Sequence, residues 1–197
     1  MAHVAPVRKE IGLRTIFNIL GPLCNPADID ARIIGVSSQT LGKTFAETMQ
    51  LMAVKRAMVV CGFEDLDEIS PEGKTHVWRL DRDSRLEYFT LEPADFGLPN
   101  HPINQVKSGT PPENAALLLR LLDGELPEDN AVQDFVLLNA AALLVCAEIA
   151  KDWKDGVRIA RESINSGNAR KALDGFVKSS SEVADLVTKL RGRTEPK

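Results

Sequence analysis

The sequence has no excess of positive charge. Its 197 residues include 24 lysines and arginines against 28 aspartates and glutamates, which makes the net charge -4 at pH 7. Proteins that bind nucleic acid neutralise phosphates with such an excess, so we expect no nucleic-acid partner. The remaining composition, 44% hydrophobic and 26% charged residues, is typical of a globular domain and excludes a disordered or fibrous chain.

Cysteine and histidine are also scarce, with three of each in the chain. No two cysteines stand at the spacing of a CxxC pair, and the histidines stand alone, so the spacing of a zinc-finger or thioredoxin site is missing. We expect reduced and mostly buried thiols at Cys24, Cys61 and Cys146.

Long apolar segments are missing as well. The first ten residues, MAHVAPVRKE, contain no apolar core of signal-peptide length. The longest apolar run, residues 135–147, is interrupted by Asn139 and is shorter than the roughly 20 apolar residues that span a bilayer. These features predict a cytoplasmic protein without a membrane partner.

The glycines do not form a phosphate-binding loop. Among the 13 glycines there is no Gly-Gly pair, no G-x-G-x-x-G and no G-x-x-x-x-G-K-[ST] pattern, which are motifs that bind phosphate at a helix N-terminus. A G-x-S-x-G nucleophile elbow and an HExxH helix are equally absent. We therefore predict no catalytic nucleophile in this sequence.

The segments that are present predict an α/β fold. Residues 15–19, 32–37 and 56–62 are short apolar runs typical of buried strands. Residues 41–55, between the second and third runs, have the spacing of an amphipathic helix and complete a βαβ unit with a right-handed crossover. Residues 75–80 and 85–91 predict an antiparallel hairpin around a turn at 81–84.

Helices dominate the rest of the chain. A loop over residues 92–112 precedes them. The predicted helix at 131–150 is apolar nearly all round and is expected to lie buried against the sheet. Gly167 is placed to cap the helix before it. The other expected helices are 113–122, 155–165, 169–176 and 181–190. The prediction is one α/β domain with a mostly parallel sheet, flanked by helices, and an antiparallel hairpin.

A first candidate site lies in residues 7–27, VRKEIGLRTIFNILGPLCNPA. Gly21 and Pro22 form a rigid turn at the end of an apolar strand. Arg8 and Arg14 precede it, and an arginine beside such a turn can bind a planar carboxylate through two parallel hydrogen bonds. The alternative interpretation is an ordinary surface arginine beside a structural turn, and composition alone favours it.

A second candidate site lies in residues 62–71, GFEDLDEISP, directly after the strongest predicted strand. In a loop, the carboxylates of Asp67 and Glu68 can converge, and such hard oxygen ligands suit Mg²⁺. A metal there would matter for a polyphosphate leaving group, whose charge grows in the transition state. The alternative interpretation is an acidic loop that is simply solvated.

Several longer motifs carry a family resemblance. They are residues 3–27, GFEDLDEISPEGKT (62–75), PADFGL (93–98), PPENAALLL (111–119), LNAAALL (138–144) and SGNARKAL (166–173). Together they resemble the motifs of the anthranilate phosphoribosyltransferase family, which occur in the same order. The resemblance runs from His3 to about Leu173.

The resemblance implies a two-domain enzyme of tryptophan biosynthesis. Family members have a small helical domain, through which they form homodimers, and a large α/β domain of the nucleoside phosphorylase/phosphoribosyltransferase-like fold. They transfer a phosphoribosyl group from phosphoribosyl pyrophosphate (PRPP) to the amine of anthranilate and require Mg²⁺. On this pattern, residues 1–197 correspond to the C-terminal part of the α/β domain, without the helical domain and the phosphate loop, and we expect the isolated chain to be inactive.

The resemblance also implies roles for individual residues. Arg8 matches the arginine that binds the anthranilate carboxylate, and Gly21 and Pro22 match the wall of the anthranilate channel. Asn18 lies at the same strand end and is assigned to the pocket. The metal ligands implied by the family pattern are Asp67 and Glu68.

Two alternatives stay open at this point. A pyrimidine-nucleoside phosphorylase-like enzyme would share the fold, but its substrates have no carboxylate for Arg8. A non-catalytic, family-related protein that binds nucleic acid would need the basic surface that the composition lacks.

Overall fold

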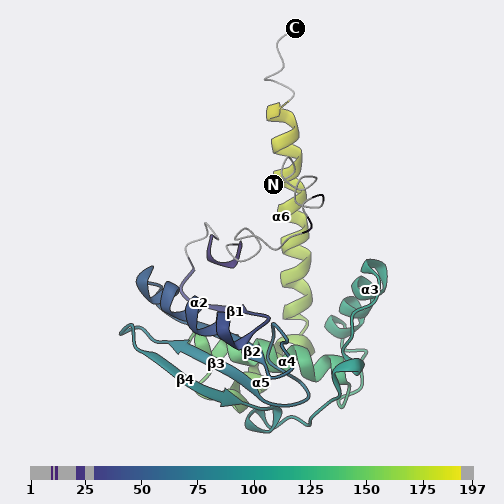
Figure 1. Ribbon diagram of the computed structural model, residues 1–197. Coiled ribbons are helices and arrows are strands. Elements are labelled where there is room, and N and C mark those ends of the chain that lie inside the picture. Colours follow the sequence, from purple (N-terminus) through teal and green to yellow (C-terminus); the bar gives the residue numbers. More distant parts are fainter. Residues whose placement is uncertain (1–9, 11, 13–20, 25–28, 192–197) are drawn as a thin grey trace.

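Four strands in the order β1-β2-β3-β4 form a mixed sheet with helices on both faces (Figure 1). The computed structural model describes residues 10, 12, 21–24 and 29–191. The strands are β1 (Arg32–Gly35), β2 (Ala57–Gly62), β3 (Thr75–Leu80) and β4 (Leu86–Leu91). The helices are α2 (Gln39–Leu51), α3 (Pro111–Leu122), α4 (Ala131–Cys146), α5 (Trp153–Asn165) and α6 (Asn168–Arg191). Short 3-10 helices are η2 (Gly21–Leu23), η3 (Pro93–Phe96) and η4 (Ile103–Gln105).

The sheet confirms the α/β fold and the antiparallel hairpin. β1 and β2 are parallel and are joined through α2, whereas β2, β3 and β4 pair antiparallel. The parallel part is therefore a single pair among the described strands, and the strand expected at residues 15–19 lies outside the described residues. At the hairpin turn, Ser84 donates its N–H to the carbonyl of Asp81 at 3.1 Å.

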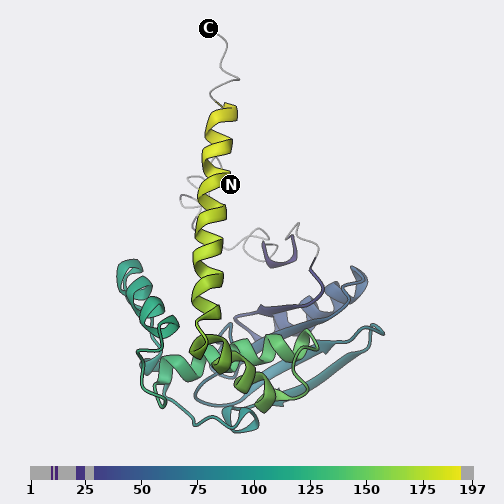
Figure 2. The same ribbon diagram turned by 180° about the vertical axis from the view of Figure 1, so that it is seen from behind.

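Two apolar clusters hold the layers together, one on each face of the sheet. On one face, α2 contributes Phe45 and Met49 to a cluster with Trp78. On the other face, α4 and α5 cover Met58 and Val77 of the strands (Figure 2). Because it is buried on both faces, β2 is the apolar centre of the sheet, as its continuous hydrophobic run predicts.

Helix α4 is buried against the sheet as predicted, through Leu138 and Ala141 among others. It departs from a wholly apolar contact, because Gln133 and Asp134 are also buried while Leu143 is 45% exposed. His101 contacts Asp134 at 2.8 Å between Nε2 and Oδ2, which gives this buried carboxylate a partner from the loop before α3. The helix also ends at Cys146, because Glu148 has a left-handed φ of 60° that an α-helix does not accommodate.

The two short helices expected at 169–176 and 181–190 are one continuous helix, α6, which extends away from the sheet (Figures 1 and 2). The intervening serines do not break it, and Ser181 donates its hydroxyl to the carbonyl of Val177 one turn earlier. Gly167, just before α6, has a φ of 73° and confirms the predicted end of α5. Among the described helices, none is both long enough and apolar enough to cross a membrane.

The cysteines are expected to differ sharply in reactivity. Cys24 is exposed, whereas Cys61 and Cys146 are buried. Burial raises the pKa of Cys61, and it raises the pKa of Cys146 to about 11, so that at pH 8 only about one Cys146 thiol in a thousand is ionised. A thiol–disulfide reagent should modify one thiol quickly in the native protein and three after denaturation. The fast phase should disappear in Cys24→Ser, and fast modification of two or more native thiols would contradict the burial of Cys61 and Cys146.

Candidate active site

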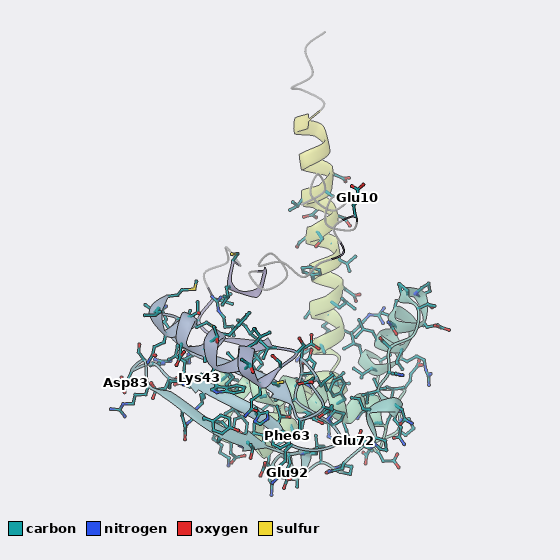
Figure 3. The ribbon with its side chains drawn as sticks, viewed as in Figure 1. Glu10, Lys43, Phe63, Glu72, Asp83 and Glu92 are labelled. Carbon is teal, nitrogen blue, oxygen red and sulfur yellow. The ribbon has the colours of Figure 1, made fainter. Side chains whose placement is uncertain are left out.

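The loop of residues 62–71 leaves the sheet where β2 ends and returns to it at β3. Phe63, at its start, donates its N–H to the carbonyl of Lys74 at 3.0 Å, which closes the loop at its base, and Figure 3 labels Phe63 and Glu72 close to its two ends. Between them, Asp67 and Glu68 are exposed to solvent. The predicted acidic pair is thus presented at the carboxyl end of β2, where open α/β sheets bind ligands.

Gly35, at the end of β1, determines how closely this loop approaches the sheet. A Cβ atom at position 35 would overlap the backbone carbonyl group of Asp67. Only glycine leaves this space to the loop, because a carbonyl group, unlike a side chain, cannot rotate away. The ends of β1 and β2 therefore meet at the acidic pair.

Asn139 of α4 holds the loop on the other side of the pair. The Ile69 N–H donates to Asn139 Oδ1 at 3.0 Å, and Asn139 Nδ2 donates to the Ile69 carbonyl at 3.4 Å. The Ile69 side chain is fully buried. Glu68 is therefore followed immediately by an anchored residue.

Ser70 organises the last part of the loop. Its hydroxyl donates to Glu64 Oε1 at 2.5 Å and accepts the N–H groups of Glu72 and Gly73, both at 3.1 Å. The Ser70 N–H donates to Thr75 Oγ1 at 2.8 Å. These bonds satisfy a buried polar residue and tie the turn to the start of β3.

The electrostatics of the acidic pair favour a cation. The pKa of Glu68 is raised, chiefly because surrounding atoms desolvate the carboxyl group and secondly because the Asp67 carboxylate is close. Glu68 as a whole remains exposed to solvent, so the desolvation is partial. A bound cation relieves the repulsion between two neighbouring carboxylates.

The donor set fits Mg²⁺ shared with a substrate. The described residues contain no group of three or more His, Cys, Asp or Glu side chains arranged around a metal. Mg²⁺ does not need one, because it usually keeps several waters and is bound by one or two carboxylates together with substrate phosphates. Asp67 and Glu68 provide that number of hard oxygen ligands.

A cluster of aromatic side chains, Phe63, His76 and Tyr88, borders the loop and was not predicted from the sequence. Phe63 stacks on His76 with ring centroids 4.2 Å apart, and His76 Nδ1 lies 2.7 Å from the Tyr88 hydroxyl. Burial lowers the pKa of His76, which favours the neutral ring. The alternation of residues along β3 and β4 could have indicated this shared face.

The predicted acceptor residues are only partly described. Gly21 and Pro22 lie in η2, where Gly21 is exposed and a Cβ atom would meet nothing within 4 Å. Leu23 of the same turn packs against the cluster under α2. Arg8 and Asn18, the other two predicted acceptor residues, lie outside the described residues.

Three residues that shape the site were missed by sequence reasoning: Gly35, Ser70 and Asn139. Their signals were a glycine at the end of a buried strand, a serine beside a proline, and a polar residue inside an apolar helix. Each signal is common, and each partner lies on another element or across a turn.

Comparisons with known proteins agree with the motifs. A family model described as "Glycosyl transferase family, a/b domain" matches residues 1–170. A relative from Schizosaccharomyces pombe named anthranilate phosphoribosyltransferase is 48% identical over 176 residues, which cover 89% of this chain and 49% of the relative. The chain thus spans about half the length of the curated relatives it matches.

Solved structures show the same similarity. Anthranilate phosphoribosyltransferase from Saccharomyces cerevisiae in complex with PRPP and Mg matches with a TM-score of 0.84 and 39% identity, over 92% of this chain and 52% of that one. The same enzyme in complex with 4-fluoroanthranilate matches with a TM-score of 0.85 and 40% identity, with equal coverage. The common fold and the match through residue 170 show that the chain belongs to the glycosyl transferase family and shares its a/b domain with the anthranilate phosphoribosyltransferases.

Proposed function

We propose that this chain carries the metal-binding and acceptor half of an active site that transfers a phosphoribosyl group from PRPP to the amine of anthranilate, in tryptophan biosynthesis. The observation that carries the proposal is the acidic pair, Asp67 and Glu68, held at the carboxyl end of β2. The names of the relatives and the PRPP, magnesium and 4-fluoroanthranilate complexes of the yeast enzyme support it.

The reaction needs positioning and charge stabilisation rather than a nucleophilic side chain. Asp67 and Glu68 would hold Mg²⁺, which, when bound, neutralises the charge that develops on the pyrophosphate leaving group. Arg8 would bind the anthranilate carboxylate with two parallel hydrogen bonds and direct the ortho amine toward the ribose C1. Gly21 and Pro22 would form one wall of the acceptor channel, beside Asn18.

The remaining parts of the site belong, in this proposal, to a segment outside residues 1–197. The phosphate-binding loop and the helical dimerisation domain would come from that segment, because no glycine-rich phosphate loop occurs in this sequence. The protein would then act as a cytoplasmic homodimer. These 197 residues by themselves would bind the acceptor and the metal without holding the phosphates of PRPP.

For the test, residues 1–197 are fused to the unmatched half of the Schizosaccharomyces pombe relative, and we call the product the joined protein. Anthranilate fluorescence is then followed after PRPP and Mg²⁺ are added. We expect turnover by the joined protein and none by the 197-residue chain. In the joined protein, Arg8→Ala should raise the KM for anthranilate about 100-fold, as the loss of charged hydrogen bonds implies.

Two outcomes of this test, and one of a separate binding measurement, would contradict the proposal. A joined protein that is folded but inactive would argue against the transferase function. Normal turnover by the 197-residue chain would show that it holds PRPP unaided. Binding of thymidine but not of anthranilate to the joined protein, measured by calorimetry, would favour the nucleoside phosphorylase alternative.

A further inference from the structure

Asn139 stands in an unusual place for an asparagine. It lies in the interior of α4 between Leu138 and Ala140, although asparagine is a poor helix former because its side chain competes for backbone hydrogen bonds. Both ends of its amide are hydrogen-bonded: Oδ1 accepts from the Ile69 N–H, and Nδ2 donates to the carbonyls of Ile69 and Phe135. The last of these bonds, at 3.1 Å, ties the side chain to its own helix.

The pairing with Ile69 is directed at the backbone. One amide side chain meets both the N–H and the C=O of a single loop residue, as a neighbouring strand would do. The two residues are 70 positions apart in the chain. Asn139 therefore fixes the path of the loop rather than the position of one side chain.

This contact and the Gly35 contact enclose the acidic pair. The Asp67 carbonyl lies against the Cα atom of Gly35, and the residue after Glu68 is held by Asn139. Two neighbouring carboxylates repel each other, so an unbraced loop would let them separate. Bracing from both sides restricts the backbone conformation of residues 67 and 68, and it does so without adding a further charge.

We propose that Asn139 is a positioning residue for the metal site, which sets the placement of Asp67 and Glu68 through the backbone of Ile69 without binding the metal itself. This inference rests on the proposed function, because it assumes that the acidic pair binds a divalent cation. Residues that orient metal ligands from behind typically change metal affinity about 10–100-fold when they are replaced.

The test uses the ¹⁵N-labelled 197-residue chain with Mn²⁺ as a paramagnetic substitute for Mg²⁺. Amide NMR signals of Asp67, Glu68 and Ile69 should broaden at lower Mn²⁺ concentrations than signals elsewhere. In Asn139→Leu, which is similar in size but offers no hydrogen bond, the Mn²⁺ concentration for half-maximal broadening should rise about tenfold. Hydrogen exchange of the Ile69 amide should accelerate about tenfold because its acceptor is lost.

The matched control is Leu143→Ala, which alters an exposed side chain of the same helix and should leave both readouts unchanged. If Asn139→Leu does not fold, Asn139→Asp tests the positioning role instead. This variant turns a carboxylate oxygen toward the carbonyls of Ile69 and Phe135, and the broken brace should raise the Mn²⁺ requirement. A direct effect of the added negative charge would lower it, which would overturn the inference.

The outcomes separate the two proposals. Selective broadening in the wild type that is unchanged in Asn139→Leu, together with faster Ile69 exchange, would overturn the positioning role and leave the metal role of the pair intact. The absence of selective broadening from the wild type would overturn the metal role, and with it the positioning role. The exchange rate of Ile69 would still report whether the Asn139 contact exists.

Discussion

Replacing Gly35 by alanine is expected to lower the free energy of unfolding by about 3 kcal/mol, the upper part of the usual range for overpacking. The added Cβ atom would overlap the backbone carbonyl of Asp67, so either β1 or the loop has to shift. Chemical denaturation measures the loss of stability. In the joined protein, the same substitution should also weaken turnover, because the loop that carries the acidic pair is displaced.

Gly73→Ala is the matched control for Gly35→Ala. Gly73 lies just beyond the same loop, but a Cβ atom there would meet nothing within 4 Å. We expect this control to stay within about 0.5 kcal/mol of the wild type, as surface substitutions usually do. Equal stability of the two variants would show that the loop does not approach Gly35 as closely as described.

The double variant Asp67→Asn/Glu68→Gln is expected to reduce phosphoribosyl transfer by the joined protein about 100-fold or more, the scale on which lost charge stabilisation affects turnover. Both side chains keep their size but lose the charge that attracts Mg²⁺. Stability should be unchanged or slightly higher, because the desolvation and the Asp67 repulsion that raise the pKa of Glu68 act only against a charged carboxylate. Turnover measured against Mg²⁺ concentration should show partial recovery at high Mg²⁺.

Asp65→Asn is the control that separates the loss of metal ligands from the loss of any negative charge in the same loop. Asp65 is an exposed acid of the same loop with a φ of 62°, a conformation that asparagine tolerates well. It removes one negative charge without touching the acidic pair, and we expect at most about a threefold change in rate, consistent with screening of exposed charges. If the double variant were no slower than Asp65→Asn, the acidic pair would have no special role.

Local pattern accounts well for the strands and for the presence of the helices, and less well for where the long helices end. β2 and the hairpin follow from short apolar runs and a turn, and the structure confirms both. The expected break within α6 was wrong, because serines at positions 179–181 weaken a helix without ending it. The burial of α4 against the sheet was confirmed, but the pairing of His101 with Asp134 was not predicted, because it joins segments that no short window contains.

The sequence by itself determined the α/β fold class, the family and the acidic pair, since these depend on apolar periodicity and on long ordered motifs. Only the tertiary structure decided how that pair is held. Gly35 contacts Asp67 from another strand, and Asn139 reaches Ile69 across 70 residues. Such contacts depend on how the layers pack, because a glycine or an asparagine acquires its role only when a distant backbone is brought against it. The two carboxylates are neighbours in the sequence, and the packing of β1 and α4 against their loop holds that loop in place.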